Sequence, residues 1–196
     1  MFKKLLNRVA LAVSLILASL QFSFADDNEA LNQFYNDFNQ AYNTLDAAKL
    51  DQLYSENASY ISDSQNEAIT RGRDNITKLY ETFFNKIKVK KARIEVDFRV
   101  IERNLNASNA TDIGYYIIRY HPSIDVGEPI SEFAGKFVMV SHKKDDGKWY
   151  VTVDTNNRSK PEFYYDAKPA AKVYYGRQFS VLTQTLTTQN HDKKPK

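Results

Sequence analysis

The stretch Gly135-Lys-Phe-Val-Met-Val-Ser-His-Lys-Lys-Asp-Asp-Gly-Lys-Trp-Tyr-Val-Thr-Val153 decides the fold of this chain. In its first arm Phe137 and Met139 share one phase of an alternating pattern, and in its second arm Trp149 and Val151 do. A period of two residues is typical of strands whose two faces differ. The Asp-Gly pair in the charged centre favours a tight turn, because glycine accepts a positive φ without steric conflict. The stretch therefore predicts a β-hairpin.

Two long strands are predicted just before this hairpin. Ile94, Val96 and Phe98 alternate with charged residues, which predicts a strand with one face in contact with water. Residues 112–121 are dense in tyrosine and isoleucine and indicate the next strand, after a turn rich in Asn and Ser at 104–109. Together with the hairpin, these segments predict four consecutive antiparallel strands.

Three helices are predicted nearer the N-terminus. Apolar residues recur every three or four positions at 29–45 and at 74–87, a spacing that lays one apolar stripe along a helix. A shorter helix is expected after Asp46, with Leu50, Leu53 and Tyr54 on its buried side, and 58–62 is expected to be a strand. Helices that precede a run of strands are typical of the α+β class. We expect a cone-shaped barrel in which a curved, mostly antiparallel sheet packs on the three N-terminal helices.

The first 25 residues have the pattern of a secretory signal peptide. Lys3, Lys4 and Arg8 accompany an apolar run from Val9 to Leu20, and Ala25 offers a small residue at the cleavage point. The apolar run is too short to span a bilayer comfortably. The sequence therefore predicts an exported protein, periplasmic or secreted, that has no membrane attachment once residues 1–25 are removed.

Charge and cysteine content exclude several classes of function. Without residues 1–25 the chain has 24 Lys and Arg and 24 Asp and Glu, so no net charge attracts it to nucleic acid. The sequence has no cysteine, which excludes disulfides, thiolate catalysis and cysteine-bound zinc. His121, His142 and His191 are too scattered to predict a metal site. We therefore predict neither a metal nor another cofactor.

The chain is expected to consist of the signal peptide, a folded domain at 26–159 and a C-terminal extension at 160–196. The extension contains a doubled tyrosine at 164–165 and another at 174–175. Its aromatic side chains are expected to fold back on the domain, and stacking on a carbohydrate or a partner is the alternative. The basic last residues are predicted to be disordered.

Four short motifs occur in an order typical of one superfamily. They are Asp46-Ala-Ala-Lys-Leu-Asp-Gln-Leu-Tyr-Ser-Glu-Asn-Ala-Ser59, Arg71-Gly-Arg-Asp-Asn-Ile76, Asp112-Ile-Gly-Tyr-Tyr-Ile117 and Asp146-Gly-Lys-Trp149. Over residues 29–159 the chain resembles the nuclear transport factor 2-like superfamily, which includes SnoaL-like and ketosteroid-isomerase-like proteins. The resemblance implies a ligand cavity between the helices and the sheet. It also implies a homodimer formed through the outer sheet face, which is common in this superfamily.

The resemblance and the strand alternation together suggest which side chains point into the cavity. The expected set is Phe38, Tyr42, Tyr60, Ser62, Tyr80, Tyr115, Arg119, His121 and Met139. Val151 and Val153 are also expected to point inward, and Trp149 is expected to belong to the core. Arg119 has two interpretations: it clamps a ligand carboxylate, or it pairs at the rim with an acid such as Glu95 or Glu132.

This expected cavity has few groups that transfer protons. The positions that resemble the catalytic groups of ketosteroid isomerases are occupied by Ser62, Met139 and Phe38. Met and Phe side chains neither donate a strong hydrogen bond nor move a proton, whereas that chemistry needs a carboxylate base and acid donors. The sequence thus predicts an exported domain that binds a small apolar or amphipathic molecule without transforming it.

Two alternatives stay open. The first is a dimeric interaction module whose cone is filled by core side chains, and a cavity below roughly a few hundred Å³ would favour it. The second is an isomerase, cyclase or hydrolase of the same fold. Its acid and base groups would be Asp63, Arg119 and His121.

Overall fold

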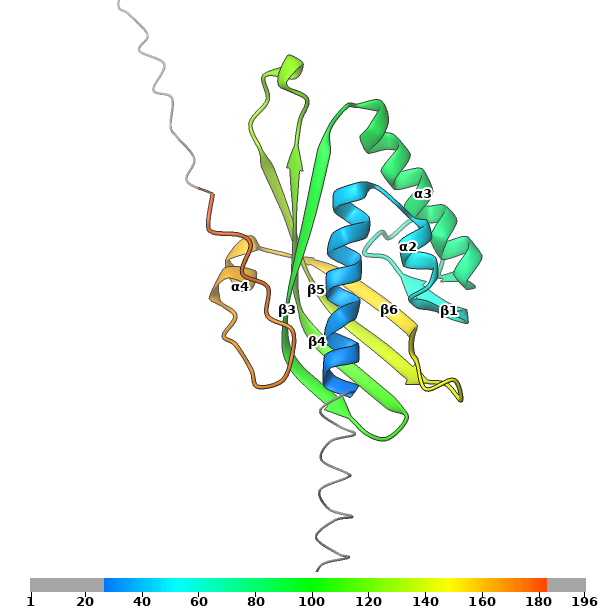
Figure 1. Ribbon diagram of the computed structural model, residues 1–196. Coiled ribbons are helices and arrows are strands. Elements are labelled where there is room, and N and C mark those ends of the chain that lie inside the picture. The colour runs from blue at the N-terminus through cyan, green and yellow to red at the C-terminus, as the bar shows by residue number, and fades with distance from the viewer. Residues whose placement is uncertain (1–26, 183–196) are drawn as a thin grey trace, which may run out of the picture.

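The computed structural model describes residues 27–182 (Figure 1). The proposed signal peptide and the basic last residues lie outside this range. The first described element is an α-helix at 27–44, here called the N-terminal helix. The other elements are α2 (Ala48–Asp51), β1 (Tyr54–Ile61), β2 (Thr70–Arg71), α3 (Arg73–Val89), β3 (Arg93–Leu105), β4 (Asn109–His121), the 3-10 turn η1 (Ile124–Val126), β5 (Ser131–Lys143), β6 (Trp149–Ser159) and α4 (Pro161–Asp166).

The six strands form one open sheet in the order β2-β1-β6-β5-β4-β3. The pair β1 and β6 is parallel and all other pairs are antiparallel. The N-terminal helix and α3 lie on one side of the sheet, and α4 lies on the other (Figure 1). The expected α+β cone with helices on a curved, mostly antiparallel sheet is confirmed. Within residues 27–182, no helix is long and apolar enough to cross a membrane.

A buried polar network holds the N-terminal helix on the sheet. The Tyr35 hydroxyl donates to the Asp112 carboxylate over 2.6 Å, and Arg103 donates two hydrogen bonds of 2.6 Å to the same carboxylate. At the start of the helix, Asp27 accepts a hydrogen bond of 2.9 Å from the indole of Trp149. Charge-assisted, bidentate bonds of this kind fix geometry as well as adding stability. The helix therefore has a defined height and angle over the cavity.

The second helix is shorter than predicted. Tyr54 was expected on its buried side but lies in β1, because the chain leaves the helix to pair with β6. The backbone N–H of Val151 donates to the carbonyl of Leu53 over 2.8 Å, and Tyr54 pairs with Val151 in parallel register. This early start of β1 points the Tyr54 hydroxyl at Asp154.

A β-bulge shifts the alternation of β6 by one residue. Ser141 of β5 pairs with Val151 and Val140 pairs with Val153, which leaves Thr152 as the extra residue. The simple alternation predicted that Val153 points inward. After the bulge Asp154 points inward instead, and only 6% of its surface is exposed. The bulge thus places a carboxyl group inside the cone.

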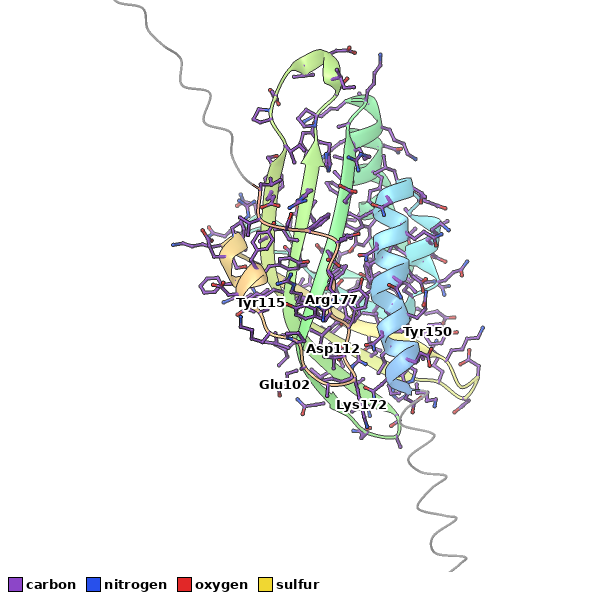
Figure 2. All side chains as sticks on the ribbon, turned by 60° about the vertical axis from the view of Figure 1, so that its left-hand side comes forward. Glu102, Asp112, Tyr115, Tyr150, Lys172 and Arg177 are labelled. Carbon is purple, nitrogen blue, oxygen red and sulfur yellow. The ribbon has the colours of Figure 1, made fainter. Side chains whose placement is uncertain are left out.

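The two faces of β4 are the reverse of the prediction. Tyr116 pairs with Phe98, and Ile118 pairs with Val96, so these side chains share the face that the helices cover. The predicted set of Tyr115, Arg119 and His121 lies on the opposite face, and Figure 2 shows Tyr115 beside α4. Large apolar or aromatic residues occur at both odd and even positions of β4, since the helices cover one face of the sheet at this strand and the C-terminal segment covers the other.

The C-terminal extension, in its described part at 161–182, covers the outer face of β3, β4 and β5. We call this segment the C-terminal strap. Tyr164 and Phe179 of the strap form a second, smaller buried cluster with Ile117 and Ala134 of the sheet. The strand β3 was predicted to have one face in water, but on that face Asp97 and Arg99 are buried under the strap, whereas Arg93 stays exposed.

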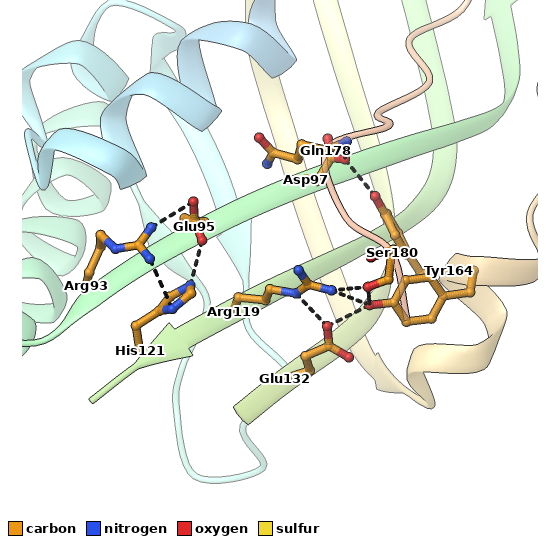
Figure 3. A network of polar contacts seen from close by, with 10 residues as sticks. Arg93, Glu95, Asp97, Arg119, His121, Glu132, Tyr164, Gln178 and Ser180 are labelled. Atoms are coloured by element: carbon orange, nitrogen blue, oxygen red, sulfur yellow. Dashed lines mark hydrogen bonds and ion pairs between the residues drawn. The ribbon is translucent and has the colours of Figure 1, made fainter. Parts of the chain in front are cut away.

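Arg99 of β3 is the centre of the contact between the sheet and the strap. Its guanidinium donates to the carbonyls of Tyr164 and Tyr165 over 2.7 and 2.9 Å. It also lies over the rings of Tyr164 and Tyr175, at 4.2 and 4.6 Å from their centroids. The Tyr164 hydroxyl donates to buried Asp97 over 2.7 Å (Figure 3). Buried charges of β3 are therefore paired with strap groups rather than with water.

The strap also pairs with the free edge of β3. The N–H of Val100 donates to the carbonyl of Tyr174 over 3.0 Å, and the N–H of Gly176 donates to the carbonyl of Phe98 over 2.8 Å. Edge strands that are covered in this way do not offer open hydrogen-bonding groups to another chain. A side chain at Gly176 would overlap the buried carboxylate of Asp97, so the packing of the strap against Asp97 requires glycine.

Candidate functional site

A cavity of about 730 Å³ lies between the N-terminal helix, α3 and the inner face of the sheet. This volume is in the range of pockets that bind small molecules, which disfavours a cone filled entirely by core side chains. Much of the wall is apolar. The apolar lining includes Phe38, Phe83, Phe98, Ile118, Phe137 and Met139.

The structure brings together most of the predicted site residues. The side chains that line the cavity as predicted are Phe38, Tyr42, Tyr60, Ser62, Tyr80 and Met139. They come from the N-terminal helix, α3, β5 and the end of β1. Most are aromatic, so the wall offers flat faces as well as phenol hydroxyls.

The prediction that Tyr115, Arg119 and His121 point into the cavity is wrong. The Tyr115 ring stacks on Phe163 of α4 with centroids 6.1 Å apart. Arg119 pairs with Glu132 over 2.7 Å and also contacts Tyr165 and Ser180 of the strap. Figure 3 shows this cluster on the outer face of the sheet. The predicted pairing of Arg119 with Glu132 is correct, but the pair lies on the outer face of the sheet and not at the cavity rim.

The alternative enzyme site made of Asp63, Arg119 and His121 does not assemble. Each of these residues has a different partner. Asp63 pairs with Arg158 over 2.5 Å at the cavity mouth, and His121 pairs with Glu95 over 2.6 Å on the outer face. Side chains on opposite faces of a sheet cannot act on one substrate atom. That assignment of catalytic groups is wrong.

The carboxyl group of Asp154 lies in the cavity floor and was missed by the sequence analysis. It accepts a hydrogen bond of 2.6 Å from Tyr54, the only one that the described residues donate to it. Burial away from water raises the pKa of Asp154 to about 6, and the Tyr54 hydrogen bond only partly opposes this effect. A carboxyl with this pKa changes its protonation close to neutral pH.

Phenol hydroxyls surround this carboxyl. The hydroxyls of Tyr54 and Tyr80 are 3.4 Å apart, and Tyr60 accepts a hydrogen bond of 3.1 Å from Asn156. Burial raises the pKa of each of these three tyrosines well above its ordinary value, so all three stay protonated at neutral pH. Because Tyr54 gives its single proton to Asp154, the hydroxyls of Tyr60 and Tyr80, which line the cavity, are the ones available as hydrogen-bond donors.

A polar row connects the cavity floor to its mouth. Asp154, Asn156 and Arg158 follow at every second position of β6, so they share the inner face. At the mouth, Arg158 meets Asp63, and Ser62 donates to Glu67 over 2.8 Å. One wall of the cavity is thus polar along its length while the opposite walls are aromatic. The polar residues at 154, 156 and 158 were visible in the sequence, but the bulge that turns them inward was not.

Within residues 27–182 no group of three or more His, Cys, Asp or Glu side chains is arranged to hold a metal ion. The absence of a metal or cofactor in the mechanism stays a prediction. The polar groups described above are hydrogen-bond donors and acceptors around one carboxyl. Their chemistry fits an organic ligand with a polar group.

The open mixed sheet and the helices that enclose this cavity define the NTF2-like cone fold. The SnoaL-like domain model matches residues 31–152, more than half of the chain, and the chain therefore belongs to the SnoaL-like family. A comparison with curated proteins gives no match.

Several solved structures have the same fold. An NTF2-like protein with a cystatin-like fold from Novosphingobium aromaticivorans is 13% identical, covers 72% of this chain and 87% of its own, and superposes with a TM-score of 0.59. ActVI-ORFA from Streptomyces coelicolor is 14% identical, with coverages of 67% and 96% and a TM-score of 0.57. A proposed dehydratase of the NTF2-like family from Streptomyces avermitilis is 14% identical, with coverages of 69% and 97% and a TM-score of 0.55. At such low identity these similarities establish the fold alone.

Proposed function

We propose that this protein binds a small amphipathic molecule in the cavity between the N-terminal helix, α3 and the sheet. The observation that carries the proposal is the Asp154 carboxyl, which faces an aromatic cavity of about 730 Å³ and has a single hydrogen bond from the described residues. A buried polar group normally has its hydrogen bonds satisfied. A ligand hydroxyl or amine that donates to Asp154 would complete them.

The cavity walls indicate the shape of the ligand. Aromatic and aliphatic side chains such as Phe38, Phe98 and Met139 suit a flat or ring-shaped apolar body. The polar row on β6 suits a ligand whose polar groups lie on one side. We therefore expect compounds with a bicyclic apolar body and one hydroxyl to bind more tightly than the matching hydrocarbons.

Thermal unfolding with a panel of such compounds tests binding. At a ligand concentration about 100 times Kd, a bound compound is expected to raise Tm by roughly 5–10 °C. The variant Ile118→Trp, which extends a large ring into the cavity, is expected to lose this shift. The matched variant Ile124→Trp, on an exposed loop, is expected to keep it. If no compound class shifts Tm of the natural protein, the binding proposal is wrong.

A second candidate function is proton transfer by Asp154. A general base is most efficient when its pKa is close to the working pH, and the pKa of Asp154 is raised to about 6. Tyr60 and Tyr80 line the same cavity and are protonated donors that suit a developing oxyanion. This carboxyl counts against the expectation that the cavity has too few titratable side chains to move protons.

Deuterium exchange separates binding from proton transfer. Ketones that bind in the panel are expected to exchange the hydrogen on the carbon next to the carbonyl with D₂O, as followed by proton NMR. Asp154→Asn is expected to lower this exchange at least about 100-fold. Binding without exchange above the buffer rate would exclude the catalytic role and leave the binding role intact.

We also propose that the protein is exported and that it forms a homodimer. The pattern at residues 1–25 supports export. The homodimer stays a prediction. The strap covers the sheet face through which the dimer was expected to form. A second copy that approached the outer face of β3, β4 and β5 would contact exposed strap residues such as Phe163 rather than the sheet itself.

A further inference from the structure

Two loops form one end of the molecule, away from the cavity floor. The first is the end of α3 with the turn into β3, at 86–93, and the second connects β4 to β5, at 121–130. Figure 1 shows both at the same end, and Lys91 and Arg93 line a shared groove with Ile124. We call these two segments together the basic end. The N-terminal helix begins at the opposite end of the molecule (Figure 1).

The basic end exposes aliphatic side chains at its most protruding points. Ile124 is 97% exposed on the 3-10 turn η1, and Val126 of the same turn is 56% exposed. Val89, the last residue of α3, is 83% exposed. Single exposed aliphatic residues are common, but these three lie on two adjoining tips, so one flat surface can meet all of them.

Positive charge surrounds these aliphatic residues. Within the eight residues 86–93 five are basic: Lys88, Lys90, Lys91 and Arg93, and also Lys86, which lines the cavity between α3 and the sheet. The acidic residues that face this end are Asp125, Glu128 and Glu95, and Glu95 is paired with Arg93 over 2.8 Å and with His121 over 2.6 Å. The basic side chains therefore outnumber the acidic ones.

Zero net charge of the exported chain does not cancel this local excess. At physiological ionic strength charges are screened over about 8 Å, so a surface responds to the charges nearest to it. The acidic residues that balance the total lie elsewhere on the molecule. A negatively charged surface that approached the basic end would therefore be attracted to it.

We propose that the basic end docks on an anionic phospholipid surface, with Ile124 and Val126 inserted among the headgroups and the lysines beside the phosphates. Exposed aliphatic residues next to clustered lysines are the pattern by which proteins attach to the surface of such membranes. Protein interfaces, by contrast, are depleted in lysine and enriched in aromatic residues. The aliphatic residues here protrude singly from tips and do not form a flat patch, which also favours a lipid surface over a protein.

Co-sedimentation of the exported chain with vesicles tests this docking. The probes are vesicles of phosphatidylcholine alone and of phosphatidylcholine mixed with phosphatidylglycerol. The natural protein is expected to bind the mixed vesicles at least about tenfold more tightly than the neutral ones, and less tightly as salt is raised. Ile124→Ser with Val126→Ser is expected to weaken binding to mixed vesicles roughly tenfold. Lys88→Glu with Lys90→Glu and Lys91→Glu is expected to weaken it at least about 100-fold.

Matched variants at other places control for general effects. Ile69→Ser changes an exposed isoleucine away from this end, and Lys144→Glu with Lys148→Glu changes lysines of the β5–β6 turn. Both controls are expected to bind vesicles like the natural protein, and all variants are checked by thermal unfolding. Failure of the natural protein to bind mixed vesicles would overturn the proposal, as would equal losses in the control variants. Binding of a protein partner through this end without vesicle binding would also overturn it.

Discussion

Replacement of Asp154 by asparagine is expected to increase the free energy of unfolding at neutral pH by about 2–3 kcal/mol. The pKa of Asp154 is about 6 in the folded protein, whereas an aspartate in an unfolded chain titrates near 3.9. A difference of roughly two units corresponds to about 3 kcal/mol against the folded state when the group is ionised. Asparagine keeps the shape of the side chain and still accepts the Tyr54 hydrogen bond, but it never becomes charged.

The pH dependence of this gain in the free energy of unfolding shows whether the Asp154 charge causes it. Between about pH 4 and pH 6 the folded protein holds a proton on Asp154 that the unfolded chain has released, so the stability contributed by this group falls as pH rises. The gain of Asp154→Asn is therefore expected to be complete above about pH 6 and to vanish below about pH 4. Urea unfolding at a series of pH values measures it.

The exposed carboxyl of Glu81 on α3 provides the control. Glu81→Gln is expected to change the free energy of unfolding by less than about 0.5 kcal/mol at every pH. A loss of stability for Asp154→Asn at all pH values would show that the carboxylate is a stabilising structural group. A gain would mean that the protein keeps a group that lowers its stability, which is typical of functional sites.

Replacement of Arg99 by alanine is expected to lower the free energy of unfolding by about 3–5 kcal/mol. The change removes the hydrogen bonds to the strap carbonyls of Tyr164 and Tyr165 and the contacts with two tyrosine rings. It also removes the cation near Asp97. Burial raises the pKa of Asp97, and Arg99 is among the groups that oppose this shift.

Arg93→Ala is the matched control, because Arg93 lies on the same face of β3 and pairs with Glu95 while remaining largely exposed. Its loss is expected to be below about 1 kcal/mol. Urea unfolding compares the two variants, and limited proteolysis reports whether the strap is released. Equal losses, or an intact strap in Arg99→Ala, would contradict the assignment of Arg99 as the main link between β3 and the strap.

The sequence predicted the elements well where one physical pattern dominates. The hairpin at 135–153 and the strand that begins near Ile94 have clear alternation, and their turns contain Gly or Asn and Ser. The boundaries of α2 were wrong, since the pairing of Leu53 with Val151 overrides local helix propensity. A contact between residues almost a hundred positions apart has no local signal.

The errors in the site have equally specific causes. In Tyr115-Tyr116-Ile117-Ile118 both phases are apolar, so alternation alone does not tell which face meets the helices. The ambiguity arises because the strap buries the outer face, so apolar residues are needed there too. The contact of the strap with Arg99 joins segments far apart in the sequence, and no local pattern predicts it. Asp154 was missed because a bulge at Thr152 reverses the phase of β6 after Val151.

The titration of the Asp154 carboxyl is the decisive measurement, since both proposed functions depend on a desolvated carboxyl in an aromatic cavity. Carbon-detected NMR of selectively labelled aspartate, assigned with Asp154→Asn, follows this group alone. A midpoint of about 6 is predicted. A midpoint near the ordinary value of about 3.9 would contradict the account, because it would place the carboxyl in water rather than in the cavity.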